Sequence, residues 1–142
     1  MYIPRSLWPE VRDRVAAGMA EMKMGDVRDP SNFVAAVIDG KAFKGHAEYQ
    51  KLAHDTADVV AGGGNDDSTG WYIDPTLVRV DDPKHRLMQE EIFGPIATVY
   101  VFDDDKWDET LHLVDTTSPY ALTGALWARD RKVIADAAAK LS

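Results

Sequence analysis

The residues best suited to chemistry in this sequence lie in the segment 89–95, which reads QEEIFGP. Glu91 and Phe93 are two positions apart, so an extended chain would place a carboxylate and a flat aromatic ring on the same side. A carboxylate can accept charge-assisted hydrogen bonds from the vicinal hydroxyls of a ribose, and a phenyl ring offers apolar surface to a heteroaromatic ring. Gly94 permits close approach, and Pro95 holds it away from helical geometry. The same pattern would also suit surface glutamates beside a core phenylalanine.

The other candidate motifs favour ordinary structural roles. The sequence has no cysteine, which excludes disulfides, thiolate zinc sites and a thiol nucleophile within it. No two of the four histidines sit with a carboxylate at a spacing that makes a metal site on one helix face. The glycines at 62–64 lack the Lys-Ser or Lys-Thr of a phosphate loop, and the acidic cluster at 103–105 lacks the ligand alternation of a calcium loop. We therefore predict no metal site, and the absence of a G-x-S-x-G elbow argues against a serine triad.

Charge and hydropathy limit the classes of partner and the cellular locations that suit this sequence. The formal net charge is -8, and the Lys and Arg residues are scattered, so nucleic acid and membrane surfaces are poor candidate partners. No apolar run approaches the length that spans a bilayer. We expect a cytoplasmic protein, or one of an organelle lumen if an import signal precedes this sequence.

The elements that would position Glu91 and Phe93 alternate between helix and strand. Apolar residues recur every four positions from Leu7 to Met19, which predicts a helix over 6–24 with Ser6 as its N-cap and Pro9 in its first turn. Further helices are expected over 40–55, after an acidic cap at 103–105, and from Asp130 onward. β-branched or continuously apolar runs predict strands at 58–61, 71–73, 76–80, 97–102 and 124–128. This alternation implies an α/β fold with a mostly parallel sheet in a single domain.

Residues 89–95 also resemble a signature of the aldehyde dehydrogenase superfamily, E-E-I-F-G-P. Segments 25–26, 37–39, 70–78 and 118–124 resemble other elements of that family in the same order. The resemblance implies an NAD cofactor, with Glu91 binding the nicotinamide ribose and Phe93 packing beside the nicotinamide. It also implies an aldehyde substrate, a homo-oligomer, and a strand at residues 1–4.

The resemblance further implies that a nucleophilic cysteine attacks the aldehyde and that this cysteine lies just upstream of Met1. No catalytic residue is therefore assigned within residues 1–142. They are expected to be a fragment of the catalytic domain, inactive by itself, with the glycine-rich NAD domain also upstream.

Three other segments resemble one branch of the family. Residues 4–9, 29–33 and 43–46 are similar to the 1-pyrroline-5-carboxylate dehydrogenases, which oxidise glutamate semialdehyde to glutamate with NAD. Two alternatives stay open: a dehydrogenase of another aldehyde, and a binding or assembly module that has the fold without the chemistry.

Overall fold

A mostly parallel sheet forms the centre of the protein. The structure, a computed structural model, describes residues 1–120 and 122–141. The four strands have the order β1 (Tyr2–Pro4), β6 (Ile96–Phe102), β5 (Thr76–Val80) and β2 (Asp58–Ala61). β1 and β5 run parallel to β6, whereas β2 pairs antiparallel to β5. The predicted α/β architecture is confirmed, and so is the strand expected at residues 1–4.

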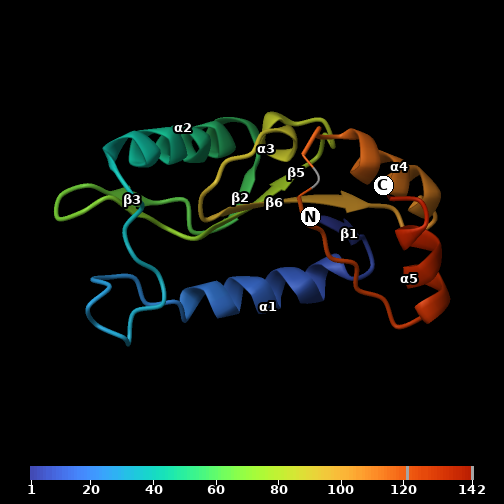
Figure 1. The fold of residues 1–142 in the computed structure, drawn as a ribbon, viewed down its shortest axis with the longest axis horizontal. Coiled ribbons are helices and arrows are strands. Elements are labelled where there is room, and N and C mark those ends of the chain that lie inside the picture. Colours follow the sequence, from blue (N-terminus) through green and yellow to red (C-terminus); the bar gives the residue numbers. More distant parts are fainter. Residues whose placement is uncertain (121, 142) are drawn as a thin grey trace.

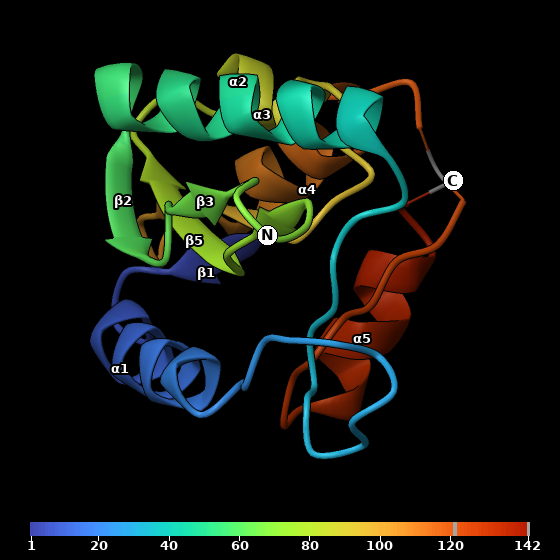
Figure 2. The same ribbon diagram turned by 90° about the vertical axis from the view of Figure 1, so that its left-hand side faces the viewer.

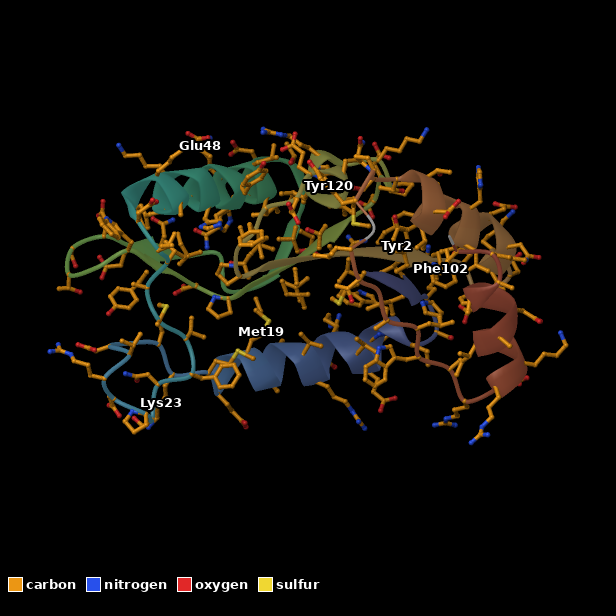
Figure 3. All side chains as sticks on the ribbon, in the orientation of Figure 1. Tyr2, Met19, Lys23, Glu48, Phe102 and Tyr120 are labelled. Atoms are coloured by element: carbon orange, nitrogen blue, oxygen red, sulfur yellow. The ribbon has the colours of Figure 1, made fainter. Side chains whose placement is uncertain are left out.

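Helices cover both faces of this sheet. α1 (Trp8–Ala20) lies against one face, and α2 (Gly40–Thr56) covers the other together with the short α3 (Arg86–Gln89) (Figures 1 and 2). Successive side chains of a strand point to opposite faces, so Leu77 of β5 packs toward α1 while Val78 and Val80 pack toward α2. Figure 3 shows Met19 on the sheet side of α1 and Glu48 on the outer side of α2.

A small hairpin and two further helices complete the fold. β3 (Asn65–Asp66) pairs with β4 (Tyr72–Ile73) beyond the predicted glycine turn, where Gly62 and Gly63 both adopt positive φ. α4 (Trp107–Thr116) follows β6, and α5 (Arg131–Ala138) packs beside it at the opposite end of the sheet from the hairpin (Figure 1). Asp130 caps α5 as predicted, because its carboxylate accepts a hydrogen bond from the amide of Lys132 at 2.8 Å.

The predicted N-cap of α1 is wrong. The helix begins at Trp8, and Leu7 occupies the N-cap position without a side-chain hydrogen bond. Pro9 lies in the first turn, as expected. Ser6 instead bonds to Asp104, whose carboxylate accepts from the Ser6 amide at 3.1 Å and from the Ser6 hydroxyl. The Ser6 hydroxyl, which the local sequence pattern predicted to cap the helix, therefore bonds to a residue 98 positions away.

The predicted acidic cap of α4 is also wrong. Lys106 occupies the N-cap position of this helix, and no side chain caps it. Asp103 pairs with Arg5 at 2.6 Å and Asp104 bonds to Ser6, so two acidic side chains of residues 103–105 tie the end of β6 to the residues after β1.

Residues 124–128 do not form the predicted strand. Their apolar composition is typical of a buried strand, yet Trp127 is 89% exposed. Among the described residues no strand pairs with them in a hydrogen-bonding ladder, and an apolar run becomes a strand only when such a partner exists. Ala121, which belongs to the family-like segment 118–124, lies outside the described residues.

No helix among the described residues combines the length and the hydropathy that crossing a membrane requires.

Candidate functional site

A cleft opens where the segment 90–94 connects α3 to β6. It has a volume of about 350 Å³ and is lined by the first residues of the chain, by α3, by the segment itself and by β6; its members include Met1, Tyr2, Leu87, Glu91, Phe93 and Thr98. Glu91 and Phe93, the two residues predicted to bind a cofactor, therefore border one cavity. The structure brings the predicted carboxylate and the predicted ring to the same place.

Phe93 is an exposed side chain and has no place in the core. It is 88% exposed, so the ring is not part of the core that the described residues form. An exposed phenylalanine loses the free energy of burial, about 1.5–3 kcal/mol for a large apolar side chain. The ring is thus available to any flat apolar ligand that enters the cleft.

The two adjacent glutamates have different environments. Glu90 accepts a hydrogen bond from the Tyr49 hydroxyl at 2.6 Å and pairs with Arg86 at 2.8 Å. The Arg86 hydrogen bond, followed by that of Tyr49, holds the pKa of the Glu90 carboxyl below its usual value. Glu91 is exposed and has no hydrogen bond or ion pair with any residue that the structure describes. Glu91 is therefore the carboxylate that remains free to accept hydrogen bonds from a ligand.

The backbone at Phe93 is held in an uncommon conformation. Its φ is 55°, the only positive value at a non-glycine residue among the described positions. Such a conformation costs of the order of 1–3 kcal/mol and persists only where neighbouring groups enforce it. The side chain of His46 on α2 provides contacts that can do so, because its Nε2 lies 3.2 Å from the carbonyl oxygens of both Ile92 and Phe93.

His46, Tyr49 and Arg86 support the site and were not predicted from the sequence. His46 and Tyr49 are three positions apart on α2, so their presence on one helix face could be read from spacing. Nothing in the spacing indicates that this face meets residues 90–93, more than forty positions along the chain. Only the packing of α2 over the segment shows their role.

The amino terminus lies at the edge of the same cleft. The backbone nitrogen of Met1 donates a hydrogen bond to the carbonyl oxygen of Thr98 at 2.6 Å. Tyr2 donates from its hydroxyl to Thr117 at 2.9 Å, which ties β1 to the end of α4.

The described residues include no group of three or more His, Asp or Glu side chains placed to hold a metal ion. What the arrangement can hold is a ligand that offers hydroxyl donors to Glu91 and a flat ring to Phe93. The sugar and base of a nucleotide have these properties.

Comparison with known sequences identifies the family. The profile of the Aldehyde dehydrogenase family matches residues 1–142. The chain is 46% identical over 136 residues to the mitochondrial delta-1-pyrroline-5-carboxylate dehydrogenase of Dictyostelium discoideum, with 94% of this chain and 24% of that protein covered. It is 44% identical over 141 residues to the enzyme of the same name from Danio rerio, with 96% and 25% covered. The chain thus spans about a quarter of the length of these curated relatives.

Solved structures agree with the sequence comparison. The chain is similar to the Delta-pyrroline-5-carboxylate dehydrogenase of Mycobacterium tuberculosis bound with NAD, at a TM-score of 0.88 and 37% identity over 99% of this chain and 25% of that one. It is also similar to the gamma-glutamyl-gamma-aminobutyraldehyde dehydrogenase of Burkholderia cenocepacia, at a TM-score of 0.90 and 27% identity, with 99% and 28% covered. The sequence profile, the relatives and the fold lead to one conclusion: the chain belongs to the aldehyde dehydrogenase family.

Proposed function

We propose that the intact protein containing this sequence is an NAD-dependent aldehyde dehydrogenase that oxidises L-glutamate γ-semialdehyde, the open form of 1-pyrroline-5-carboxylate, to glutamate. Residues 1–142 would form part of its catalytic domain. The observation that carries the proposal is the shared cleft, in which Glu91 has a free carboxylate and Phe93 an exposed ring. The names of the relatives from Dictyostelium discoideum and Danio rerio support the choice of substrate.

In this proposal, Glu91 accepts hydrogen bonds from the hydroxyls of the nicotinamide ribose, and Phe93 packs against the nicotinamide. The cofactor supplies the hydride acceptor. The sequence contains no cysteine, so a thiol nucleophile would come from outside residues 1–142. Because Met1 lines the cleft, a segment that precedes it in the intact protein would enter beside Glu91 and Phe93. The 142-residue chain by itself is expected to have no dehydrogenase activity.

The test compares Glu91→Gln with Glu109→Gln in the intact protein, with formation of NADH as the readout. Glu91→Gln removes the charge from the proposed ribose acceptor, so kcat/KM for NAD is expected to fall by about tenfold or more, the loss typical of one charge-assisted hydrogen bond. Glu109 is an exposed carboxylate on α4 that does not line the cleft, and its exchange is the control. Unchanged kinetics in Glu91→Gln would remove its proposed role.

The same assay decides between the alternatives. A dehydrogenase of another aldehyde would show a higher kcat/KM with that aldehyde than with glutamate semialdehyde. A non-catalytic module would show no turnover with any aldehyde, even as the intact protein. Activity in the isolated 142-residue chain would contradict the proposal that its nucleophile lies elsewhere.

Location and assembly are also proposals. The expected cytoplasmic location competes with the mitochondrion, which the names of the relatives from Dictyostelium discoideum and Danio rerio specify for those proteins. Fractionation of the source cells would decide between them. A homo-oligomer is proposed from the family resemblance, and light scattering of the intact protein would test it.

A further inference from the structure

The inference concerns His46, a buried histidine of α2 that contacts the backbone of Ile92 and Phe93. Its side chain is 5% exposed, and its Nε2 is 3.2 Å from the carbonyl oxygens of Ile92 and Phe93. A carbonyl oxygen can only accept, so Nε2 must carry the proton and donate to both oxygens. Nδ1, the other ring nitrogen, is buried and has no hydrogen-bond partner among the described residues.

The two carbonyl groups could not meet one donor in a regular strand. Successive carbonyl groups of an extended chain point to opposite sides, because the backbone is pleated. Here consecutive carbonyl oxygens converge on a single nitrogen, and the residue between the two carbonyl carbons, Phe93, has a φ of 55°. The histidine contact and the left-handed backbone therefore belong to the same local geometry.

The imidazole also packs against the residue that follows. A Cβ atom added at Gly94 would lie 2.3 Å from His46 Nε2, so the ring occupies the volume that a side chain at this position would need. Glycine at position 94 thus permits the close approach on which both hydrogen bonds depend.

Phe93 stands between two hollows. One is the cleft shared with Glu91, and the other is an apolar hollow of about 390 Å³ that Phe93 lines together with Ile92 and residues of α2, His46 among them. A return of Phe93 to extended geometry would change the direction of its side chain relative to both hollows.

We propose that His46 is a positioning residue for Phe93. By donating one N–H to two consecutive carbonyl groups, it holds the left-handed backbone that presents the ring to the nicotinamide. The inference rests on the proposed function for the identity of the ligand, whereas the contact itself stands on the geometry alone.

The test uses three variants of the intact protein. His46→Leu replaces the imidazole with an apolar side chain and so removes the hydrogen-bond donor. His46→Gln retains an N–H that can reach a similar position. His54→Leu is the matched control, because it removes the same kind of contact, from His54 Nε2 to the carbonyl oxygen of Gly63 at 3.0 Å, elsewhere on the same helix. Two readouts are compared: the KM for NAD, and the hydrogen exchange of the Ile96 amide in protein without cofactor.

His46→Leu is expected to raise the KM for NAD by about fivefold with a smaller change in kcat. This is the size of effect that the loss of about one hydrogen bond produces. A mere loss of folded enzyme would instead lower kcat and leave the KM unchanged. The Ile96 amide donates to Gly94 at 2.8 Å, so its exchange should accelerate by about fivefold when the segment loosens. His46→Gln should restore both values to within about twofold, and His54→Leu should change neither.

Unchanged KM and unchanged exchange in His46→Leu would overturn the inference. So would a failure of His46→Gln to restore either value, because the donor would then not be the cause. If the unmodified intact protein neither binds NAD nor turns over, the proposed function fails and the cofactor role of Phe93 fails with it. The exchange comparison would still decide whether His46 holds the segment, so the two failures are distinguishable.

Discussion

At the scale of single residues, the site shows that hydrogen-bond partners can give two identical side chains different roles. Glu90 and Glu91 are neighbours of the same type, yet Arg86 and Tyr49 engage only Glu90. A carboxylate held by a cation and a hydroxyl is occupied and stabilises the segment, whereas a free carboxylate can exchange water for a ligand. The sequence alone could not separate them, because both belong to the same E-E pair.

The dependence of the free energy of unfolding on pH, at acidic pH, should show whether ionised Glu90 stabilises the protein. Its pKa lies below the usual 4.5, because Arg86 and then Tyr49 hydrogen-bond to the ionised form. A lowered pKa contributes stability above the ordinary value and loses it as the pH falls through the folded-state value. Glu90→Gln should therefore lower the free energy of unfolding at neutral pH and have a smaller effect well below pH 4.5.

Urea unfolding at the two pH values, followed by tryptophan fluorescence, measures this difference. The pair is exposed, so added salt should reduce the effect at neutral pH. An equal loss of stability at both pH values would show that the ionised form of Glu90 is not what stabilises the segment.

At the scale of elements, α2 is the support on which the site depends. It begins at the predicted residue, Gly40, because Asp39 accepts a hydrogen bond from the Ala42 amide at 2.7 Å. His46 and Tyr49 on one of its faces reach the segment 90–93. A change in where this helix begins or in its orientation would therefore shift the residues that line the cleft.

Asp39→Ala is expected to destabilise the protein by about 1 kcal/mol, because it removes the N-cap of α2. Asp39→Asn retains an acceptor oxygen and should lose only a few tenths of a kcal/mol. Urea unfolding of the two variants provides the measurement. Equal losses in both would indicate that the carboxylate charge, rather than the cap hydrogen bond, is responsible.

The contact between α2 and the segment can be tested by a double-mutant cycle. Gly94→Ala places a Cβ within 2.3 Å of His46 Nε2, so it should destabilise the protein strongly. In a His46→Ala background the imidazole is absent, and the same exchange should cost less by about 0.5–3 kcal/mol, the range of coupling between residues in contact. Additive free energies of unfolding would contradict the contact.

Periodicity and turn residues were sufficient to predict most elements but not their tertiary bonds. The four-residue repeat of α1 and the apolar run of β6 are local signals, and the structure confirms both elements. Ser6 and Asp104 do not act as the predicted caps because each bonds to the other at the ends of the neighbouring strands β1 and β6, which a local pattern cannot reveal. His46 could not be predicted as a site residue for the same reason, since its partners are carbonyl groups that every residue carries.

At the scale of the whole molecule, a large share of apolar surface is uncovered. Leu122 is 95% exposed, and Ile38 and Trp127 are each 89% exposed. A further apolar hollow of about 480 Å³ lies among α4, α5 and residues 124–126. Contiguous exposed apolar surface marks a place where another part of a protein, or another chain, is buried. The composition of residues 124–128 predicted burial, yet the structure shows four of these five residues exposed. A sequence does not show which neighbour would cover such a segment.

The 142-residue chain, produced by itself, is expected to bind a hydrophobic dye and to associate with other copies. Each exposed large side chain favours burial by about 1.5–3 kcal/mol, and association is the available route to it. Dye fluorescence and light scattering at several concentrations measure the two effects. Leu122→Ser combined with Trp127→Ser should reduce both, because it removes two of the most exposed apolar groups. A monodisperse monomer with no dye enhancement would show that these side chains find cover within the chain, and they would then not mark a binding surface.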